Sequence, residues 1–163
     1  MLTAKGKYGL KALAHLAALE PGEIAQATHI AKAHNISKKF LDAILGDLRN
    51  AGLVESRKGR HGGYCLARPA RDIEIGRAIR ALDGPLAPIR CASRTAYRPC
   101  RDCRNVRRCV VRITMAQVRD AMSDILDGLT LANMAAAKTA TRRRAPKSKR
   151  PTRGDRAKPI PRP

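Results

Sequence analysis

The stretch Ser37-Lys38-Lys39-Phe40-Leu41-Asp42-Ala43-Ile44-Leu45-Gly46-Asp47-Leu48-Arg49-Asn50-Ala51-Gly52 decides the fold. Ser37 is a favourable helix N-cap, and Gly52 stands where helices commonly stop. An apolar stripe at helical spacing lies between them, formed by Phe40, Leu41, Ile44, Leu45 and Leu48. A shorter helix is expected over residues 26–34, with a tight connection before Ser37. Two such helices around a tight turn predict a helix-turn-helix.

A β-hairpin is expected directly after this motif. Two strand-like runs, 53–57 and 63–67, flank a basic loop rich in glycine. A hairpin in this position is the wing of a winged helix. Its glycines allow a close approach to another backbone, and Arg57, Lys58 and Arg60 make a phosphate backbone the expected partner. The fold class is therefore mainly α with a small β-hairpin wing.

Further helices are expected on both sides, over residues 5–19 and 74–82. From residue 106 the apolar positions alternate steps of four and three, which predicts a long helix to residue 137. The seam of this helix is formed by Val111, Met115, Val118, Met122, Ile125 and Leu129. It can fold back on its own domain or pair with a second copy, and we expect a homodimer because helix-turn-helix proteins commonly bind two half-sites.

The charge of the chain points to a polyanionic partner. The 163 residues carry 34 Lys and Arg against 13 Asp and Glu, a formal net charge of +21. The scarcity of aromatic residues (3 Tyr, 1 Phe and no Trp) favours double-stranded DNA over single strands or RNA, whose readers need stacking platforms. Residues 138–163 form a basic, proline-rich tail that we expect to be disordered.

Membrane partners are not expected. The sequence has no apolar run long enough to span a bilayer and no signal peptide, because Lys5, Lys7 and Lys11 interrupt its start. A cytoplasmic location is therefore expected, where thiols stay reduced and clustered cysteines favour metal or redox chemistry.

Four of the five cysteines lie within 19 residues: Cys91, Cys100, Cys103 and Cys109. Thiolates are ligands that both iron–sulfur clusters and zinc prefer. Eight arginines surround this loop, and positive neighbours are expected to favour thiolate over thiol. Cys65 lies in a predicted strand and is expected to be a buried, apolar-like thiol rather than a ligand.

Several motifs together resemble the IscR/NsrR/RirA group of bacterial winged-helix regulators, the Rrf-two superfamily. They are the opening residues 2–13, the segments 36–41 and 48–54, the wing 59–64 and the cysteine loop. The resemblance covers residues 1 to about 135. It divides the chain into a winged-helix domain (1–83), a cysteine-rich loop (84–105), a dimerisation helix (106–137) and the tail (138–163).

The resemblance implies a homodimer whose recognition helices enter the major groove. By position, Ser37, Lys38, Lys39 and Asp42 face the bases, and Arg49, Lys58 and Arg60 contact phosphates or a groove. Asp42 stands where a relative has the longer glutamate that senses cytosine, which leaves the base preference there open.

The same resemblance implies that Cys91, Cys103 and Cys109 ligate a cluster. The usual fourth ligand is missing, because Arg112 replaces a histidine and Lys7 replaces an acidic residue. Cys100 is the obvious substitute, and a four-iron cluster with one labile site is the alternative.

The sequence thus predicts a non-enzymatic, DNA-binding transcriptional regulator, a repressor, whose operator binding depends on a 2Fe-2S or 4Fe-4S cluster sensing iron, cluster or redox status. The alternatives are a winged-helix regulator with structural zinc or with a metal-free thiol redox switch. An architectural chromosome protein driven by the tail is a further competitor.

Overall fold

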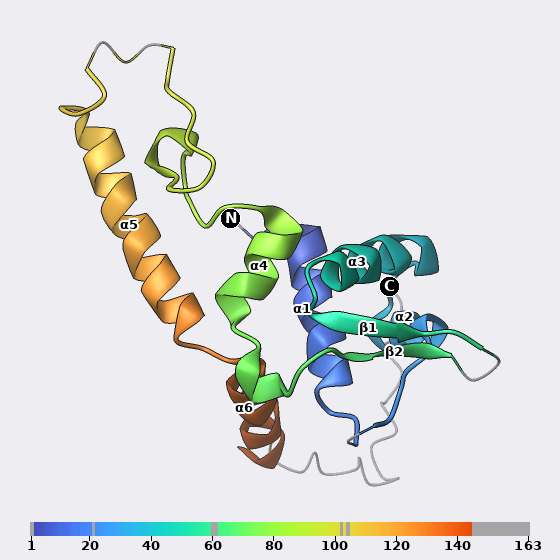
Figure 1. The fold of residues 1–163 in the computed structure, drawn as a ribbon. Coiled ribbons are helices and arrows are strands. Elements are labelled where there is room, and N and C mark those ends of the chain that lie inside the picture. The colour runs from blue at the N-terminus through green and yellow to red at the C-terminus, as the bar shows by residue number, and fades with distance from the viewer. Residues whose placement is uncertain (1, 21, 60–61, 102, 104, 145–163) are drawn as a thin grey trace, which may run out of the picture.

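The computed structural model describes residues 2–20, 22–59, 62–101, 103 and 105–144. Figure 1 shows a body of short helices and a hairpin, with a long helix standing beside it and a last helix beneath. The expected winged helix is present, and most predicted elements begin and end within a few residues of their expected bounds.

The helix-turn-helix consists of α2 (Ala27–His34) and α3 (Lys38–Asn50), and α1 (Ala4–Leu16) precedes it. Asn35 takes the left-handed conformation (φ 51°) that lets the chain turn sharply after α2, and asparagine tolerates it better than most residues. The apolar stripe of α3 faces inward, where Leu41, Ile44, Leu45 and Leu48 are completely buried. Four of the five residues of the predicted stripe therefore lie in the core, and Phe40 is partly buried against it.

The wing consists of β1 (Val54–Arg57) and β2 (Gly63–Leu66), paired antiparallel with Val54 opposite Leu66. Tyr64 also exchanges two backbone hydrogen bonds with Ala25, at 2.8 and 3.0 Å, which ties β2 to the segment before α2. A Cβ on Gly63 would stand 2.5 Å from the Ala25 carbonyl oxygen. The glycine is thus required by a close approach to the protein's own backbone, whereas the sequence analysis assigned the wing glycines to a phosphate backbone.

Helix α4 (Ile75–Asp83) crosses α1 at close range. A Cβ on Gly9 would stand 2.2 Å from Leu82 Cδ1, so the two helices approach where α1 lacks a side chain. Helix α4 also packs on α3 and on α5, so it lies between the DNA-binding motif and the long helix (Figure 1).

The long helix differs from its prediction. The structure has α5 over Val110–Asp127 and α6 over Leu131–Arg144 instead of one helix over 106–137. The chain breaks because residues 129–131 pair with the start of α4: Ile75 N donates to Leu129 O (2.9 Å) and Leu131 N to Ile73 O (2.8 Å). Leu131 is completely buried, so α6 begins inside the body.

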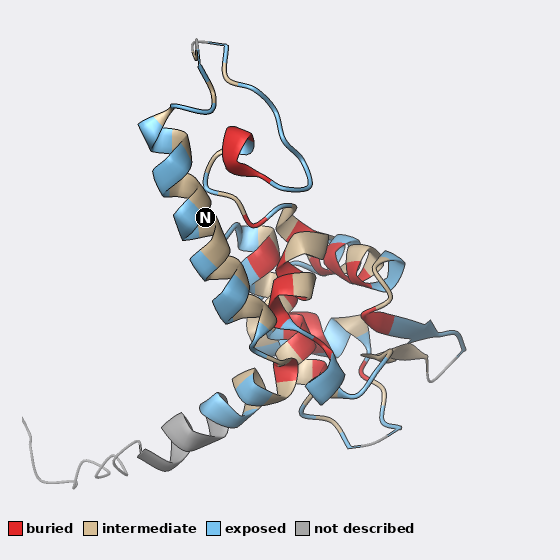
Figure 2. Cartoon of the chain, turned by 60° about the vertical axis from the view of Figure 1, so that its left-hand side comes forward, coloured by how far each residue is buried: buried red, intermediate tan, exposed pale blue. Residues whose placement is uncertain are grey.

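The basic tail is also partly ordered, because α6 continues to Arg144, beyond the residue 138 at which disorder was expected. The remainder of the expected tail, residues 145–163, lies outside the described residues. In Figure 2 the buried residues gather in the body and in one turn of the cysteine loop, whereas α5 has none.

Candidate functional site: a DNA-binding surface and a cysteine centre

The first turn of α3 forms a positively charged edge. Ser37 accepts a hydrogen bond on Oγ from Phe40 N (3.3 Å), so this side chain caps the helix. Lys38 and Lys39 follow it, both exposed, and the turn contains no acidic residue. Positive charge is unfavourable at a helix N-terminus because the macrodipole is positive there. These lysines therefore reduce helix stability, and an anionic partner explains their position better than the fold does.

Asp42 lies one turn further along α3, on the same face as Lys38. Lys38 Nζ donates to Asp42 Oδ2 at 2.7 Å, and the carboxylate raises the pKa of the lysine through this hydrogen bond and its charge. Lys39 has no ion-pair partner in the described part of the chain. Two of the predicted base-facing residues are thus engaged with each other, a feature that the sequence analysis did not predict.

The other predicted DNA contacts lie on separate elements. Arg49 is exposed at the far end of α3, eleven residues after Lys38, which is roughly 16 Å along the helix axis. Arg57 and Lys58 are exposed at the end of β1 and the start of the wing loop. Arg60 lies outside the described residues.

The cysteine centre lies between the short 3-10 turn η2 (Arg90–Ala92) and the start of α5. Cys91 is only 3% exposed and shares a hydrogen bond with the Cys100 thiol. Cys103 Sγ and Cys109 Sγ are 3.8 Å apart. All five cysteines are present as thiols. The loop therefore brings the four predicted ligands together as two neighbouring pairs.

The arrangement of these pairs falls short of an assembled metal site. Within the described residues, no three His, Cys, Asp or Glu side chains stand close enough to hold one metal ion. The charge of Cys109 nevertheless acts on Cys91, so the two pairs are neighbours. The donors fit a soft-metal centre by their chemistry, because all four are thiols on one loop.

The arginines around the loop were expected to favour thiolate over thiol, and at Cys91 they do not. The pKa of Cys91 is raised, first by its hydrogen bond with Cys100 and then by burial and the charge of its neighbours. Arg112 Nε donates to the Cys91 carbonyl oxygen at 2.9 Å, and Arg119 donates to the Ala92 carbonyl oxygen. These arginines hold the turn through its backbone and do not promote a thiolate at Cys91. Cys65 is half-buried in β2 rather than buried, and lies outside the centre.

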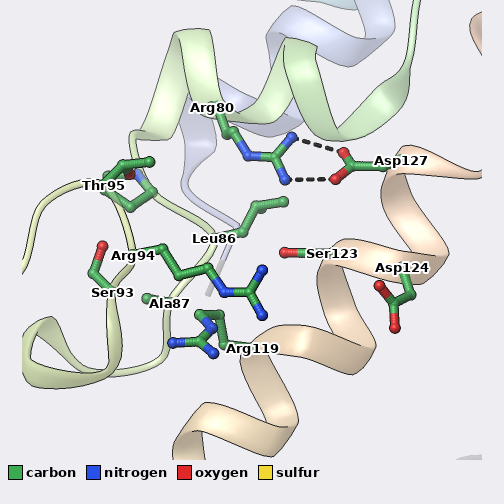
Figure 3. A pocket seen from close by; sticks show the side chains of 11 residues that line it. Arg80, Leu86, Ala87, Ser93, Arg94, Thr95, Arg119, Ser123, Asp124 and Asp127 are labelled. Carbon is green, nitrogen blue, oxygen red and sulfur yellow. Dashed lines mark hydrogen bonds and ion pairs between the residues drawn. The ribbon is translucent and has the colours of Figure 1, made fainter.

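A polar cavity of about 210 Å³ separates the cysteine turn from α4 and α5 (Figure 3). Arg80 of α4 forms a bidentate pair with Asp127 of α5, with both N–O distances at 2.7 Å. Asp120 accepts from both Arg94 and Arg119 on the opposite side. The Arg80–Asp127 pair attaches the end of α5 to α4, and the Arg94–Asp120 pair attaches the middle of α5 to the cysteine loop.

The predicted dimer seam divides into two groups on α5. Met115 and Met122 are half-buried, and Met122 lines an apolar cavity together with Leu126. The other seam residues are exposed. Val111 (62% exposed), Val118 (38%) and Ile125 (63%) form the outer face of α5, and Leu129 (42%) follows after the helix ends. The helix thus packs on its own body with one side and presents an apolar strip along the adjacent side.

Comparison with known families agrees with this geometry. Residues 2–137 match the Rrf2 family, described as an iron-dependent transcriptional regulator. The chain belongs to the Rrf2 family. An rrf2-like HTH-type transcriptional regulator of Rhodobacter capsulatus is 44% identical over 140 residues, which covers 84% of this chain and 93% of the relative.

Solved structures of Rrf2 regulators share the fold. CymR, the global cysteine regulator of B. subtilis, superposes with a TM-score of 0.68 at 31% identity, covering 84% of this chain and 97% of that one. T. potens IscR superposes with a TM-score of 0.67 at 29% identity, covering 91% and 93%. The predicted family and winged-helix fold are therefore confirmed, and the chain is a DNA-binding transcriptional regulator.

No helix in the described ranges has the length and apolarity needed to cross a membrane.

Contacts between distant segments hold the elements of the site together. Arg77 of α4 donates to the carbonyl oxygen of Ala51, which ends α3, at 3.3 Å. Contacts such as Arg77–Ala51 and Arg80–Asp127 join residues 26 and 47 positions apart, and no local sequence signal could have predicted them.

Proposed function

We propose that this Rrf2 protein is a repressor whose operator binding is controlled by an iron–sulfur cluster held by Cys91, Cys100, Cys103 and Cys109. The observation that carries the proposal is the gathering of these four thiols as two neighbouring pairs at the start of α5. The description of the family as iron-dependent supports iron over zinc. A bound cluster would supply a centre sensitive to iron supply, oxidation and loss of sulfide.

The residues around the centre give it a route to the rest of the molecule. Arg112 and Arg119 bind the backbone of the cysteine turn from α5, and Asp127 at the other end of α5 binds Arg80 of α4. A cluster bound by these thiols would change their positions, and α5 is the element attached to the loop that holds them.

We further propose that the regulator acts as a homodimer through the outer face of α5. The exposed apolar residues of this face need a partner, and a second copy offers the same strip for symmetric packing. Two copies would present two α3 helices to neighbouring half-sites of duplex DNA.

The test is purification of the full chain without oxygen, followed by an absorption spectrum and measurement of iron, sulfide and zinc per subunit. The proposal expects visible absorption with iron and sulfide present, and operator binding that changes when the cluster is removed. A colourless protein with zinc would contradict it in favour of a structural zinc site.

A metal-free thiol switch is the second candidate. The 3.8 Å between Cys103 Sγ and Cys109 Sγ favours it, since a small movement would allow a disulfide between them. CymR, to which the chain is similar, is a regulator of cysteine. A colourless, metal-free protein with a reversible Cys103–Cys109 disulfide, found by mass spectrometry after mild oxidation, would support this candidate.

A further inference from the structure

The ion pair between Lys38 and Asp42 lies on the exposed face of α3. Lys38 Nζ and Asp42 Oδ2 are 2.7 Å apart, and the two residues are separated by one helical turn. Their side chains are 59% and 40% exposed, so the pair is open to an incoming partner. Lys39, the adjacent lysine, has no such partner in the part of the chain that the structure describes.

Helix stability does not explain this pair. An exposed i,i+4 pair is weak, and the order with lysine first is the less favourable one. Asp42 is the fifth residue of α3, beyond the first turn in which a carboxylate would satisfy unpaired backbone N–H groups. The helix end is already capped by Ser37. The carboxylate therefore serves a purpose other than folding.

A carboxylate on this surface has a cost for DNA binding. Its charge repels the phosphates of every sequence, so it lowers non-specific affinity. Such a residue is useful where it increases discrimination between sequences. Lysine has a long, flexible side chain that would otherwise reach the nearest phosphate. The bond to Asp42 holds the ammonium over the body of the helix, which is the part of a recognition helix near the base edges.

The ammonium selects a particular base edge. It has three N–H donors and no acceptor, so it needs acceptors on the base. Guanine presents two adjacent acceptors, N7 and O6, in the major groove, whereas adenine places an amino donor beside its N7.

We infer that Lys38 reads a guanine of the operator and that Asp42 is the positioning residue that directs Lys38 to it, rather than a reader of cytosine. The inference rests on the assignment of α3 as the recognition helix. Lys39 then contributes charge to phosphate binding without selecting a base.

The experiment selects duplexes from a random library with the full chain and then titrates the best operator and its single-base variants. Four variants are compared with the unchanged chain: Lys38→Met, Asp42→Asn, the two combined, and Lys39→Met as a matched control. Binding to random DNA is measured for each at one salt concentration.

We expect Lys38→Met to abolish a preference for guanine at one position, worth about tenfold or more in affinity. Asp42→Asn should raise binding to random DNA several-fold and weaken the same guanine preference. In the combined variant, Asp42→Asn should have no effect on the guanine preference beyond that of Lys38→Met. Lys39→Met should weaken all sequences by similar factors and leave every base preference unchanged.

Two results would overturn the inference alone. In the first, Asp42→Asn loses a preference for cytosine, and Lys38→Met keeps that preference unchanged. In the second, the effects of the two substitutions at the guanine position are additive. If the unchanged chain enriched no sequence at all, the regulator function would fail together with the inference.

Discussion

Cys91 shows how one residue can belong to a functional centre and to the core at once. Its thiol is buried beside Cys100, and its carbonyl oxygen accepts from Arg112 of α5. A change at this residue therefore affects the centre through the sulfur, while the turn remains held through the backbone.

We expect Cys91→Ala to abolish the visible absorption of the anaerobically purified protein while the winged helix stays folded. The matched control is Cys65→Ala, which removes a half-buried thiol from β2 and should keep the spectrum. The control should lower the free energy of unfolding by only about 0.5–1.5 kcal/mol. An unchanged spectrum in Cys91→Ala would exclude this cysteine as a ligand.

A second prediction at this scale concerns two helical glycines. Gly9→Ala should lower the free energy of unfolding by about 1–3 kcal/mol, because its Cβ would meet Leu82 of α4 at 2.2 Å. Gly46→Ala in α3 should instead raise it by roughly 0.5–1 kcal/mol, since nothing lies within 4 Å and alanine favours the helix. Denaturant unfolding of both variants checks this, and equal effects would contradict the close α1–α4 approach.

At the scale of elements, α4 connects the parts of the molecule. Its Arg77 donates to the end of α3, its Arg80 pairs with Asp127 of α5, and its closest packing is with α1. The pairing of residues 73–75 with 129–131 adds a backbone connection at the start of the helix. Helix α4 therefore contacts both the end of α3 and α5.

We expect Asp127→Asn to lower the free energy of unfolding by about 0.5–1 kcal/mol at pH 7, a discounted value because the Arg80 and Asp127 side chains are 36% and 37% exposed. Arg80 lowers the pKa of Asp127 through their hydrogen bonds. The contribution is thus complete above pH about 4 and is lost as the pH falls through the lowered pKa.

Chemical denaturation between pH 7 and about 3 measures this difference. Asp124→Asn is the control, because this carboxylate is exposed on α5 and has no ion-pair partner in the described residues. A difference between Asp127→Asn and the unchanged chain that grew toward low pH would contradict the role of the ion pair.

For the whole molecule, the outer face of α5 is the feature that a single chain leaves unexplained. Val118 and Ile125 are exposed on this face, next to the side of the helix that rests on α4 and η2. The half-buried Met122 belongs to the inner side, so a charge there would disturb the subunit itself.

We expect Val118→Asp to convert the dimer to a monomer, because it places a charge in the middle of the apolar strip. Operator affinity should fall strongly, since each monomer would bind one half-site. Sedimentation velocity measures the assembly, and Gln117→Asp on the neighbouring exposed face is the control that should stay dimeric. A dimer that survives Val118→Asp would move the interface to another surface.

Local patterns determined much of this protein. The caps, the apolar stripe of α3 and the glycine-rich hairpin predicted the winged helix because these signals act within a few residues. The cysteine spacing predicted four thiols in one loop. One local signal was missed in the sequence. Thr130 and Asn133 cap each other at the start of α6, and this pair marks a break in the long helix.

Only the tertiary structure decided how these parts are connected. The seam continues through Leu129 at a helical period, yet the chain breaks there because residues 73–75 offer backbone partners that are distant in sequence. The pKa of Cys91 is raised despite the many arginines in the loop, because its hydrogen bond with Cys100 and, after it, burial dominate at that thiol. Packing between distant segments fixes such features, since the free energy of each contact depends on neighbours that no local pattern specifies.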